Sequence, residues 1–244
     1  MVRGLPDDAN VQGYGDISGG DDQAALAVRL GTAAGYSKRP VILYLDDFST
    51  GADSWTVERS SVEENATLTG DYTLTGGAAL LFNPADDSSE FMTAEKTLAE
   101  FPDAIYGLFA MVGISPDNPN FRLQLVVYDG FHIRTYMLMV NATTQELLYK
   151  DSAGSSVVIG TGINSMSALG HFHALGVVVD LENDAYMQLT VDGVAYDLSG
   201  IATQAVLNGT APRIVVSVYT KNDGSGVANA AVDSIGFVQN PLQL

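Results

Sequence analysis

The sequence contains no cysteine and few basic residues. Without cysteine, disulfides, thiol catalysis and thiolate-bound zinc are all excluded, so a hydrophobic core must supply the stability. Lysine and arginine together number 11, against 29 aspartates and glutamates, which gives a formal net charge of −18. Because this charge repels phosphate backbones and anionic lipid surfaces, we expect neither a nucleic acid nor a membrane as a partner.

Long apolar segments are also missing. No stretch approaches the roughly 18 uninterrupted apolar residues of a membrane-spanning helix. The N-terminal residues, MVRGLPDD, lack the apolar segment of a secretory signal, so we expect no signal peptide. At 244 residues, of which 46% are hydrophobic, the chain is long enough to bury the core of one large β domain.

The segment 171–199 gives the clearest indication of the fold. A β-branched run, Val177–Val179, indicates a buried strand, and Glu182–Asp184 supplies residues that tolerate turn geometry. Alternating residues then lead into Asp192-Gly193, a dipeptide that favours a type I′ turn between antiparallel strands. This one segment therefore predicts three antiparallel strands.

Similar turn signals divide the rest of the chain. Asp129-Gly130 lies between two long apolar stretches and predicts a second hairpin. Roughly fourteen short strands and one short helix, within 21–34, follow from this pattern. The prediction is an all-β fold: an antiparallel two-sheet jelly-roll sandwich over residues 41–244, preceded over residues 1–40 by an extended arm with a short helix.

The expected arm has an apolar set of its own. Residues 1–20 are rich in glycine and aspartate and cannot order themselves by burial. Leu26, Val28 and Leu30, in the short helix, would be costly to leave in water. We therefore expect the arm to pack against a neighbouring subunit, which predicts a homo-oligomer and attachment to a larger protein assembly.

Several short motifs occur in an order that is typical of one fold family. They are Asp46-Asp47-Phe48 with the single tryptophan Trp55, His171-Phe172-His173 before a valine-rich strand, Asp192-Gly193 before Tyr196-Asp197-Leu198, and Val232-Asp233-Ser234-Ile235. This order resembles the concanavalin A-like, laminin-G-like jelly roll over about residues 41–240. The resemblance implies glycan binding, glycan cleavage or structural display. The N-terminal arm that runs into the sandwich is similar in layout to bacteriophage virion proteins that carry such a domain.

Two groups of residues are candidate metal ligands. Asp46, Asp47 and Asp233 lie near the two ends of the sandwich sequence, and the first and last strands of jelly rolls commonly pair. Such pairing would bring these carboxylates together around calcium, and apart from this candidate ion we expect no cofactor. Solvated turn acids beside a structural aspartate are the alternative. His171 and His173 would share one strand face, but no third ligand is evident, and a packed pair is the commoner outcome.

Aromatic residues are the candidate glycan ligands. Five of them would form a sugar-stacking platform if they shared an exposed sheet face: Tyr128, Phe131, Tyr136, Tyr186 and Tyr196. In a sandwich of this size, however, most aromatic side chains must fill the core. The Glu-x-Asp-x-x-Glu string of the jelly-roll glycosidases is absent, as is Gly-x-Ser-x-Gly, so we expect no enzymatic activity.

Three functions follow, in order of preference. The first is a structural, assembly-associated protein, a virion capsid-decoration or surface component that displays the jelly roll on the particle surface. The alternative is a carbohydrate-binding module. The third is a glycan hydrolase whose catalytic residues the motifs do not reveal.

Overall fold

The structure, a computed structural model, describes residues 41–60, 65–74, 77–84, 90–99, 104–118, 120–162, 169–222 and 229–241. These residues form sixteen β-strands, and no helix, and hence none that could cross a membrane, lies among them. The strands are β1 (Val41–Asp46), β2 (Thr56–Arg59), β3 (Asn65–Thr69), β4 (Ala79–Asn83), β5 (Phe91–Leu98), β6 (Ile105–Ile114), β7 (Asn120–Tyr128), β8 (His132–Asn141), β9 (Glu146–Lys150), β10 (Ser156–Thr161), β11 (Phe172–Asp180), β12 (Ala185–Val191), β13 (Val194–Ala202), β14 (Ala205–Leu207), β15 (Arg213–Lys221) and β16 (Ala230–Gln239). The all-β prediction is confirmed. The arm over 1–40, with the short helix expected in it, lies outside the described residues.

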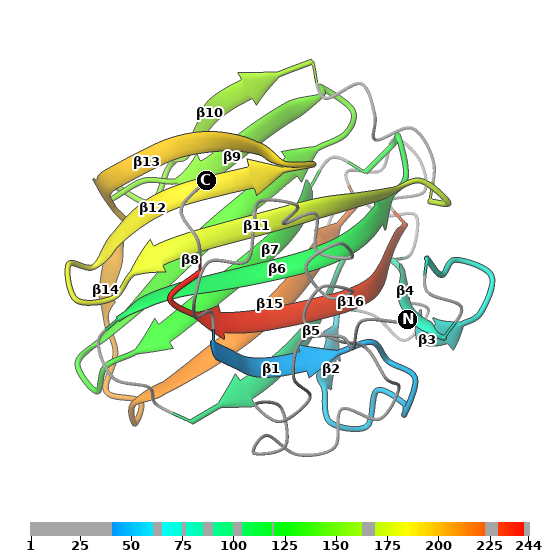
Figure 1. Cartoon of the computed structure of the whole chain (residues 1–244), viewed down its shortest axis with the longest axis horizontal. Helices are drawn as coiled ribbons and strands as arrows, with labels where there is room; N and C mark the ends of the chain where they lie inside the picture. Colours follow the sequence, from blue (N-terminus) through cyan, green and yellow to red (C-terminus); the bar gives the residue numbers. More distant parts are fainter. Residues whose placement is uncertain are drawn as a thin grey trace, which may run out of the picture.

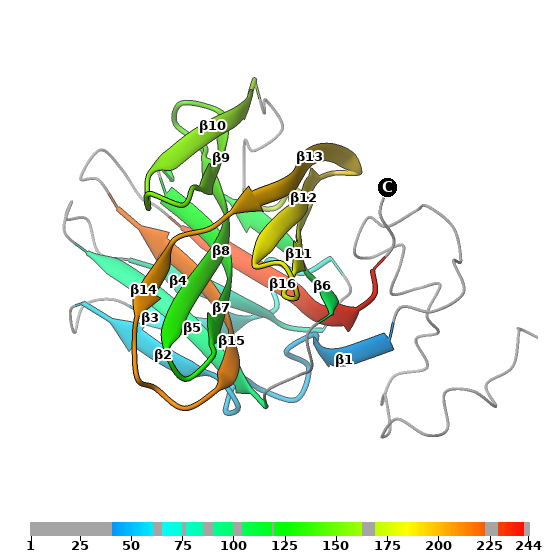
Figure 2. The ribbon, with the colours of Figure 1, turned by 90° about the vertical axis from the view of Figure 1, so that its left-hand side faces the viewer.

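The strands form two antiparallel sheets that pack as a sandwich (Figure 1). In sheet A the strand order is β13-β12-β11-β6-β16-β4-β3, with β1 beside β16. In sheet B the order is β10-β9-β8-β7-β15-β5-β2, with β14 beside β8. Figure 2 shows the two layers from the side. Alternate residues of both sheets, such as Phe237 and Leu123, fill one core between the layers. The predicted antiparallel two-sheet jelly roll is therefore confirmed.

The first and last strands pair, as the jelly-roll resemblance implied. One edge of β16 pairs with β4 through Ala230–Val232 and then with β1 through Ile235–Gln239. The register of β16 against β6 shifts between Val232 and Ser234, so Asp233 is the extra residue of a β-bulge. Its side chain is fully buried, and Oδ1 accepts a hydrogen bond of 2.8 Å from the backbone N–H of Leu74. Asp233 therefore ties the connection between β3 and β4 to the last strand.

Side chains from β12 and from the β13–β14 connection complete an interrupted edge of sheet B. The strand β8 pairs with β14 at residues 132–134 and with β9 at residues 138–141, which leaves a break between them (Figure 2). Within this break, the backbone N–H of Met137 donates to the Tyr186 hydroxyl at 2.8 Å. The Thr203 hydroxyl donates to the backbone oxygen of Thr135 at 2.6 Å. Because Tyr186 is fully buried and belongs to β12, it links the two sheets through the core.

The two predicted Asp-Gly hairpins differ in their turns. Asp192 and Gly193 both have positive φ, 50° and 80°, as a type I′ turn requires. At the β7–β8 connection only Gly130 has positive φ, 91°, and the backbone N–H of Asp129 donates to the His132 oxygen. The central residues there are Gly130 and Phe131, the pattern of a type II′ turn, so Phe131 stands at the tip of the hairpin.

Candidate functional site

The outward-facing side chains of sheet B form three aligned rows. Their chain neighbours, such as Leu123, Val216 and Ala94, belong to the core, so the alternate positions point away from it. Read from β8 across β7 and β15 to β5, the rows are Met139-Arg122-Tyr219-Thr93, Met137-Gln124-Ser217-Glu95 and Thr135-Val126-Val215-Thr97. Beyond the last row, Tyr128 of β7 lies opposite Arg213 of β15. We call this set the outer face of sheet B.

Two arginine–tyrosine pairs mark the ends of the outer face. The Arg122 guanidinium lies 4.5 Å from the ring centre of Tyr219, and that of Arg213 lies 4.7 Å from the ring centre of Tyr128. The Nε of Arg122 also donates to Asn120 Oδ1 at 2.6 Å. Arg122 and Tyr128 are six positions apart on β7, so the two pairs are about 20 Å apart along the sheet. The tyrosine rings therefore hold both guanidinium groups on this face.

The middle of the outer face is more buried than the solvent side of a sandwich usually is. Met137 and Val215 are each 3% exposed, and Ser217 is 1% exposed. The Ser217 hydroxyl is buried and makes no hydrogen bond within the described structure. A buried hydroxyl that lacks a partner costs about 1–3 kcal/mol, and a ligand recovers this cost once the side chains that cover the hydroxyl move aside to admit it. The low exposure and the unpartnered Ser217 hydroxyl therefore favour contact with a ligand over contact with bulk solvent.

Glu95 is the acidic group in the middle row. Burial, together with the nearby Glu58 carboxylate, raises the pKa of Glu95, although Arg213 opposes the shift. Thr56 of β2 is the direct partner of Glu95, and Glu58 follows two residues later on the same side of β2. The two carboxylates are therefore diagonal neighbours on adjacent strands.

Replacing Glu95 by glutamine is expected to stabilise the fold near neutral pH. Because the folded-state pKa is raised, ionised Glu95 costs stability as the pH rises beyond about 4.3, the ordinary glutamate value. Since the group is only half buried, the gain in Tm should be about 2 °C, and it should vanish near pH 3. Thermal unfolding of Glu95→Gln, with Glu182→Gln in an exposed loop as the control, measures this. A lower Tm for Glu95→Gln at neutral pH would show that the carboxylate is needed for the fold.

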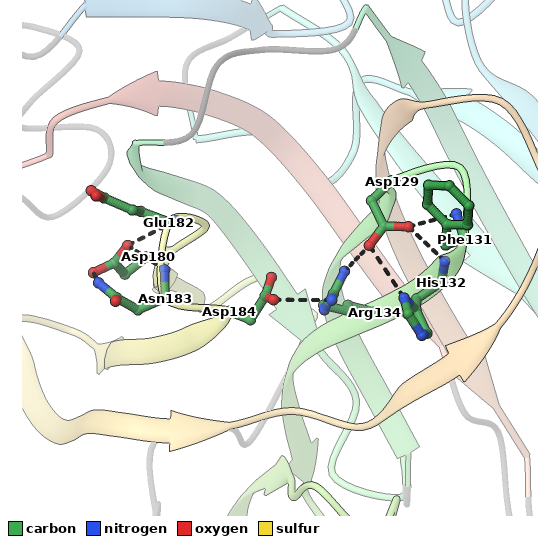
Figure 3. Close-up of polar contacts among 8 residues, drawn as sticks. All are labelled: Asp129, Phe131, His132, Arg134, Asp180, Glu182, Asn183 and Asp184. Carbon is green, nitrogen blue, oxygen red and sulfur yellow. Dashed lines mark hydrogen bonds and ion pairs between the residues drawn. The ribbon is translucent and has the colours of Figure 1, made fainter.

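A second polar cluster joins two hairpins at one end of the sandwich (Figure 3). Arg134 of β8 pairs with Asp129 in the β7–β8 turn and, at 2.9 Å, with Asp184 in the β11–β12 turn. Asp129 also accepts hydrogen bonds from the backbone N–H groups of His132 and Phe131. Although burial opposes it, these bonds from Arg134 and the backbone lower the pKa of Asp129. The opposite charges of this cluster therefore pair with one another. The ring of Phe131, which belongs to the same cluster, is 76% exposed.

The five aromatic residues predicted to bind glycans do not share a face. Tyr128 lies on the outer face of sheet B, and Phe131 lies at the hairpin tip. Tyr136 and Tyr186 are fully buried, with ring centres 5.2 Å apart in the core, so the interpretation of these two as stacking residues is wrong. Tyr196 is partly buried and packs against the same core. Core filling, the alternative considered from the sequence, holds for these last three.

The predicted calcium ligands make other contacts. Asp46 accepts hydrogen bonds from Tyr44, from the indole of Trp55 and from the backbone of Phe48. Asp47 accepts from Ser49, and Asp233 holds the β3–β4 connection. Within the part of the chain that the structure describes, no three histidine, aspartate or glutamate side chains are grouped to hold a metal. A calcium site at Asp46, Asp47 and Asp233 stays a prediction.

The histidine pair and the arm contain the remaining site residues that were predicted from the sequence. His173 is 5% exposed, and its Nδ1 lies 2.7 Å from Asp192 Oδ2, whereas His171 is exposed and precedes β11. The packed alternative therefore describes His173. Leu26, Val28 and Leu30, the predicted assembly residues, lie outside the described residues.

Comparison with known proteins supports the fold. No protein-family model and no curated protein matches the sequence. The carbohydrate esterase vb_24B_21 of the Shiga toxin-encoding bacteriophage phi24B is similar in structure, with 16% sequence identity, a TM-score of 0.55, and coverage of 83% of this chain and 100% of that chain. The cellulose-induced protein Cip1 is similar with 12% identity, a TM-score of 0.50, and coverage of 82% and 99%. The chain thus has a concanavalin A-like jelly-roll fold, with a bacteriophage protein among its structural neighbours.

Proposed function

We propose that the protein is a structural component of a virion that binds carbohydrate on the outer face of sheet B. The observation that carries the binding role is the outer face itself, where two arginine–tyrosine pairs enclose a row of partly or fully buried polar groups. A sugar presents C–H surfaces that pack on aromatic rings and hydroxyls that both donate and accept. Gln124, Ser217 and Glu95 supply donors and acceptors in one line across the sheet.

The virion role has separate support. The bacteriophage esterase has the same kind of fold over its whole length, and the fold alone is compatible with display as well as with catalysis. A net charge of −18 favours solubility of a protein exposed at high local density. In this proposal the sandwich faces outward on the assembled particle, and residues 1–40, with Leu26, Val28 and Leu30, attach it to neighbouring subunits.

Binding to an immobilised glycan panel tests the carbohydrate role. We expect the wild-type protein to bind at least one glycan, and Ser217→Ala to weaken that binding about five- to tenfold, because one hydrogen bond of about 1 kcal/mol is lost. Ser234→Ala is the matched control. Ser234 is also 1% exposed, and its hydroxyl makes no hydrogen bond among the described residues, but it lies on the outward side of sheet A. Equal effects of the two variants, or no binding to any glycan, would overturn the proposal.

Glycan hydrolysis is the second candidate function, and one observation favours it. Glu95 has a raised pKa and a carboxylate neighbour, Glu58, on the same face. In glycosidases a difference in pKa distinguishes the carboxyl group that acts as the general acid from its partner carboxylate. If the wild-type protein released reducing sugar from a bound glycan and Glu95→Gln did not, the function would be hydrolysis rather than binding. We expect no release from wild type or variant.

A further inference from the structure

The charge of the outer face of sheet B differs from that of the rest of the molecule. In the part of the chain that the structure describes there are seven lysines and arginines, and four of them occupy outward positions on sheet B: Arg122, Lys150, Arg213 and Lys221. Only three of the seventeen described aspartates and glutamates do so, namely Glu58, Glu95 and Glu146. The face is therefore weakly basic, whereas the remaining described surface is strongly acidic.

Within the described part of the chain, Arg122 and Arg213 also lack the ion-pair partners that other basic groups have. Arg134, by contrast, pairs with two aspartates. Neither Arg122 nor Arg213 forms an ion pair with a carboxylate among the described residues, and the Nε of Arg213 is buried with no hydrogen-bond partner there. Partial burial lowers the pKa of Arg122. Two partly buried arginines that have no carboxylate partner among the described residues are costly to maintain unless something anionic binds them.

The acidic groups that share the outward side of sheet B, namely Glu58, Glu95 and Glu146, are fewer than its four basic groups. The acidic surface elsewhere on the molecule does not cancel this local charge, because charges are screened beyond about 8–10 Å at physiological ionic strength.

From these charges we infer that the outer face of sheet B takes an anionic polysaccharide, with Arg122 and Arg213 each holding one acidic group. This inference rests on the proposed carbohydrate-binding role and names the class of glycan. The planar guanidinium, which lies near a tyrosine ring, offers paired N–H donors that match a carboxylate, sulfate or phosphate group. Because the two arginines lie about 20 Å apart, a polymer reaches both of them and a monosaccharide does not.

Three defined probes distinguish the source of the negative charge. Polygalacturonate carries carboxylates, dextran sulfate carries sulfates, and dextran is neutral. We expect polygalacturonate or dextran sulfate to bind at least tenfold more tightly than dextran by isothermal titration calorimetry, and the tighter of the two identifies the preferred acid. Galacturonic acid monomer should bind at least tenfold more weakly than the polymer that carries the same group.

Charge-neutral variants test the residues. Arg122→Gln and Arg213→Gln should each weaken binding of the preferred anionic polymer about tenfold and leave dextran binding unchanged, since each removes one charge-assisted contact. Arg59→Gln is the matched control, because Arg59 lies on β2 of the same sheet, at a position that faces the core side. Preference for dextran, with Ser217→Ala still weakening binding, would overturn this inference and leave the proposed function standing. Failure of all three polymers together with every glycan of the panel would overturn both.

Discussion

Replacing Tyr186 by phenylalanine is expected to lower the free energy of unfolding by about 2–3 kcal/mol. The Tyr186 hydroxyl accepts the hydrogen bond of the Met137 backbone N–H at the break in the edge of β8. Neither β9 nor β14 reaches this position, and the site is fully buried, so the variant leaves a backbone donor without a partner. Burial also raises the pKa of the Tyr186 hydroxyl to about 12, which keeps it protonated at every pH at which the fold would be studied.

Urea denaturation measures this effect, with Tyr149→Phe as the control. Tyr149 packs edge-on against Tyr186 at 5.7 Å and is nearly as buried, but the described structure gives its hydroxyl no hydrogen bond. We expect Tyr149→Phe to change stability by less than about 0.5 kcal/mol. Similar losses in the two variants would show that the hydroxyl of Tyr186 does not bridge the sheets.

Arg134→Met is expected to lower the free energy of unfolding by about 2 kcal/mol near neutral pH. The variant keeps the length of the side chain but removes the charge that joins the β7–β8 turn to the β11–β12 turn (Figure 3). Asp129 has a lowered pKa in the folded protein, so its contribution to stability is present above about pH 4, the unfolded value, and is lost as the pH falls through the folded value. The difference between variant and wild type should therefore shrink near pH 3.

Chemical denaturation at neutral pH and near pH 3 tests that dependence. Lys150→Met, on strand β9, controls for the loss of a positive charge from an acidic protein. A deficit for Arg134→Met that is the same at both pH values would mean that lost packing, rather than the ion pairs with Asp129 and Asp184, explains the change.

The sequence predicted the turns better than it predicted which side chains share one face of a sheet. Asp192-Gly193 specifies a type I′ turn because both residues tolerate positive φ, and the structure has that turn. Asp129-Gly130 also predicts a hairpin, but the Asp129 carboxylate caps the turn, so the central pair moves one residue along. That shift places Phe131 at an exposed tip, which the dipeptide alone does not reveal.

The candidate site depends on which strands are neighbours. Along β7 the partly exposed Arg122 and Gln124 alternate with the buried Phe121 and Leu123. Its partner β15 lies about ninety residues later in the chain, and only the pairing of the two places Ser217 beside Gln124. The sequence indicates even less well whether a tyrosine side chain is buried or exposed, because a strand that shifts by one residue exchanges its buried and exposed sides.

Mapping by amide NMR tests the central claim most directly. The isotope-labelled protein is titrated with the glycan that binds it best, and the residues whose amide resonances shift are located on the fold. We expect the largest shifts on β5, β7 and β15, around Glu95, Gln124 and Ser217, and no comparable shifts on β6, β11 or β16 of sheet A. Shifts concentrated on sheet A, or confined to the hairpin tip at Phe131, would contradict the assignment of the binding site to the outer face of sheet B.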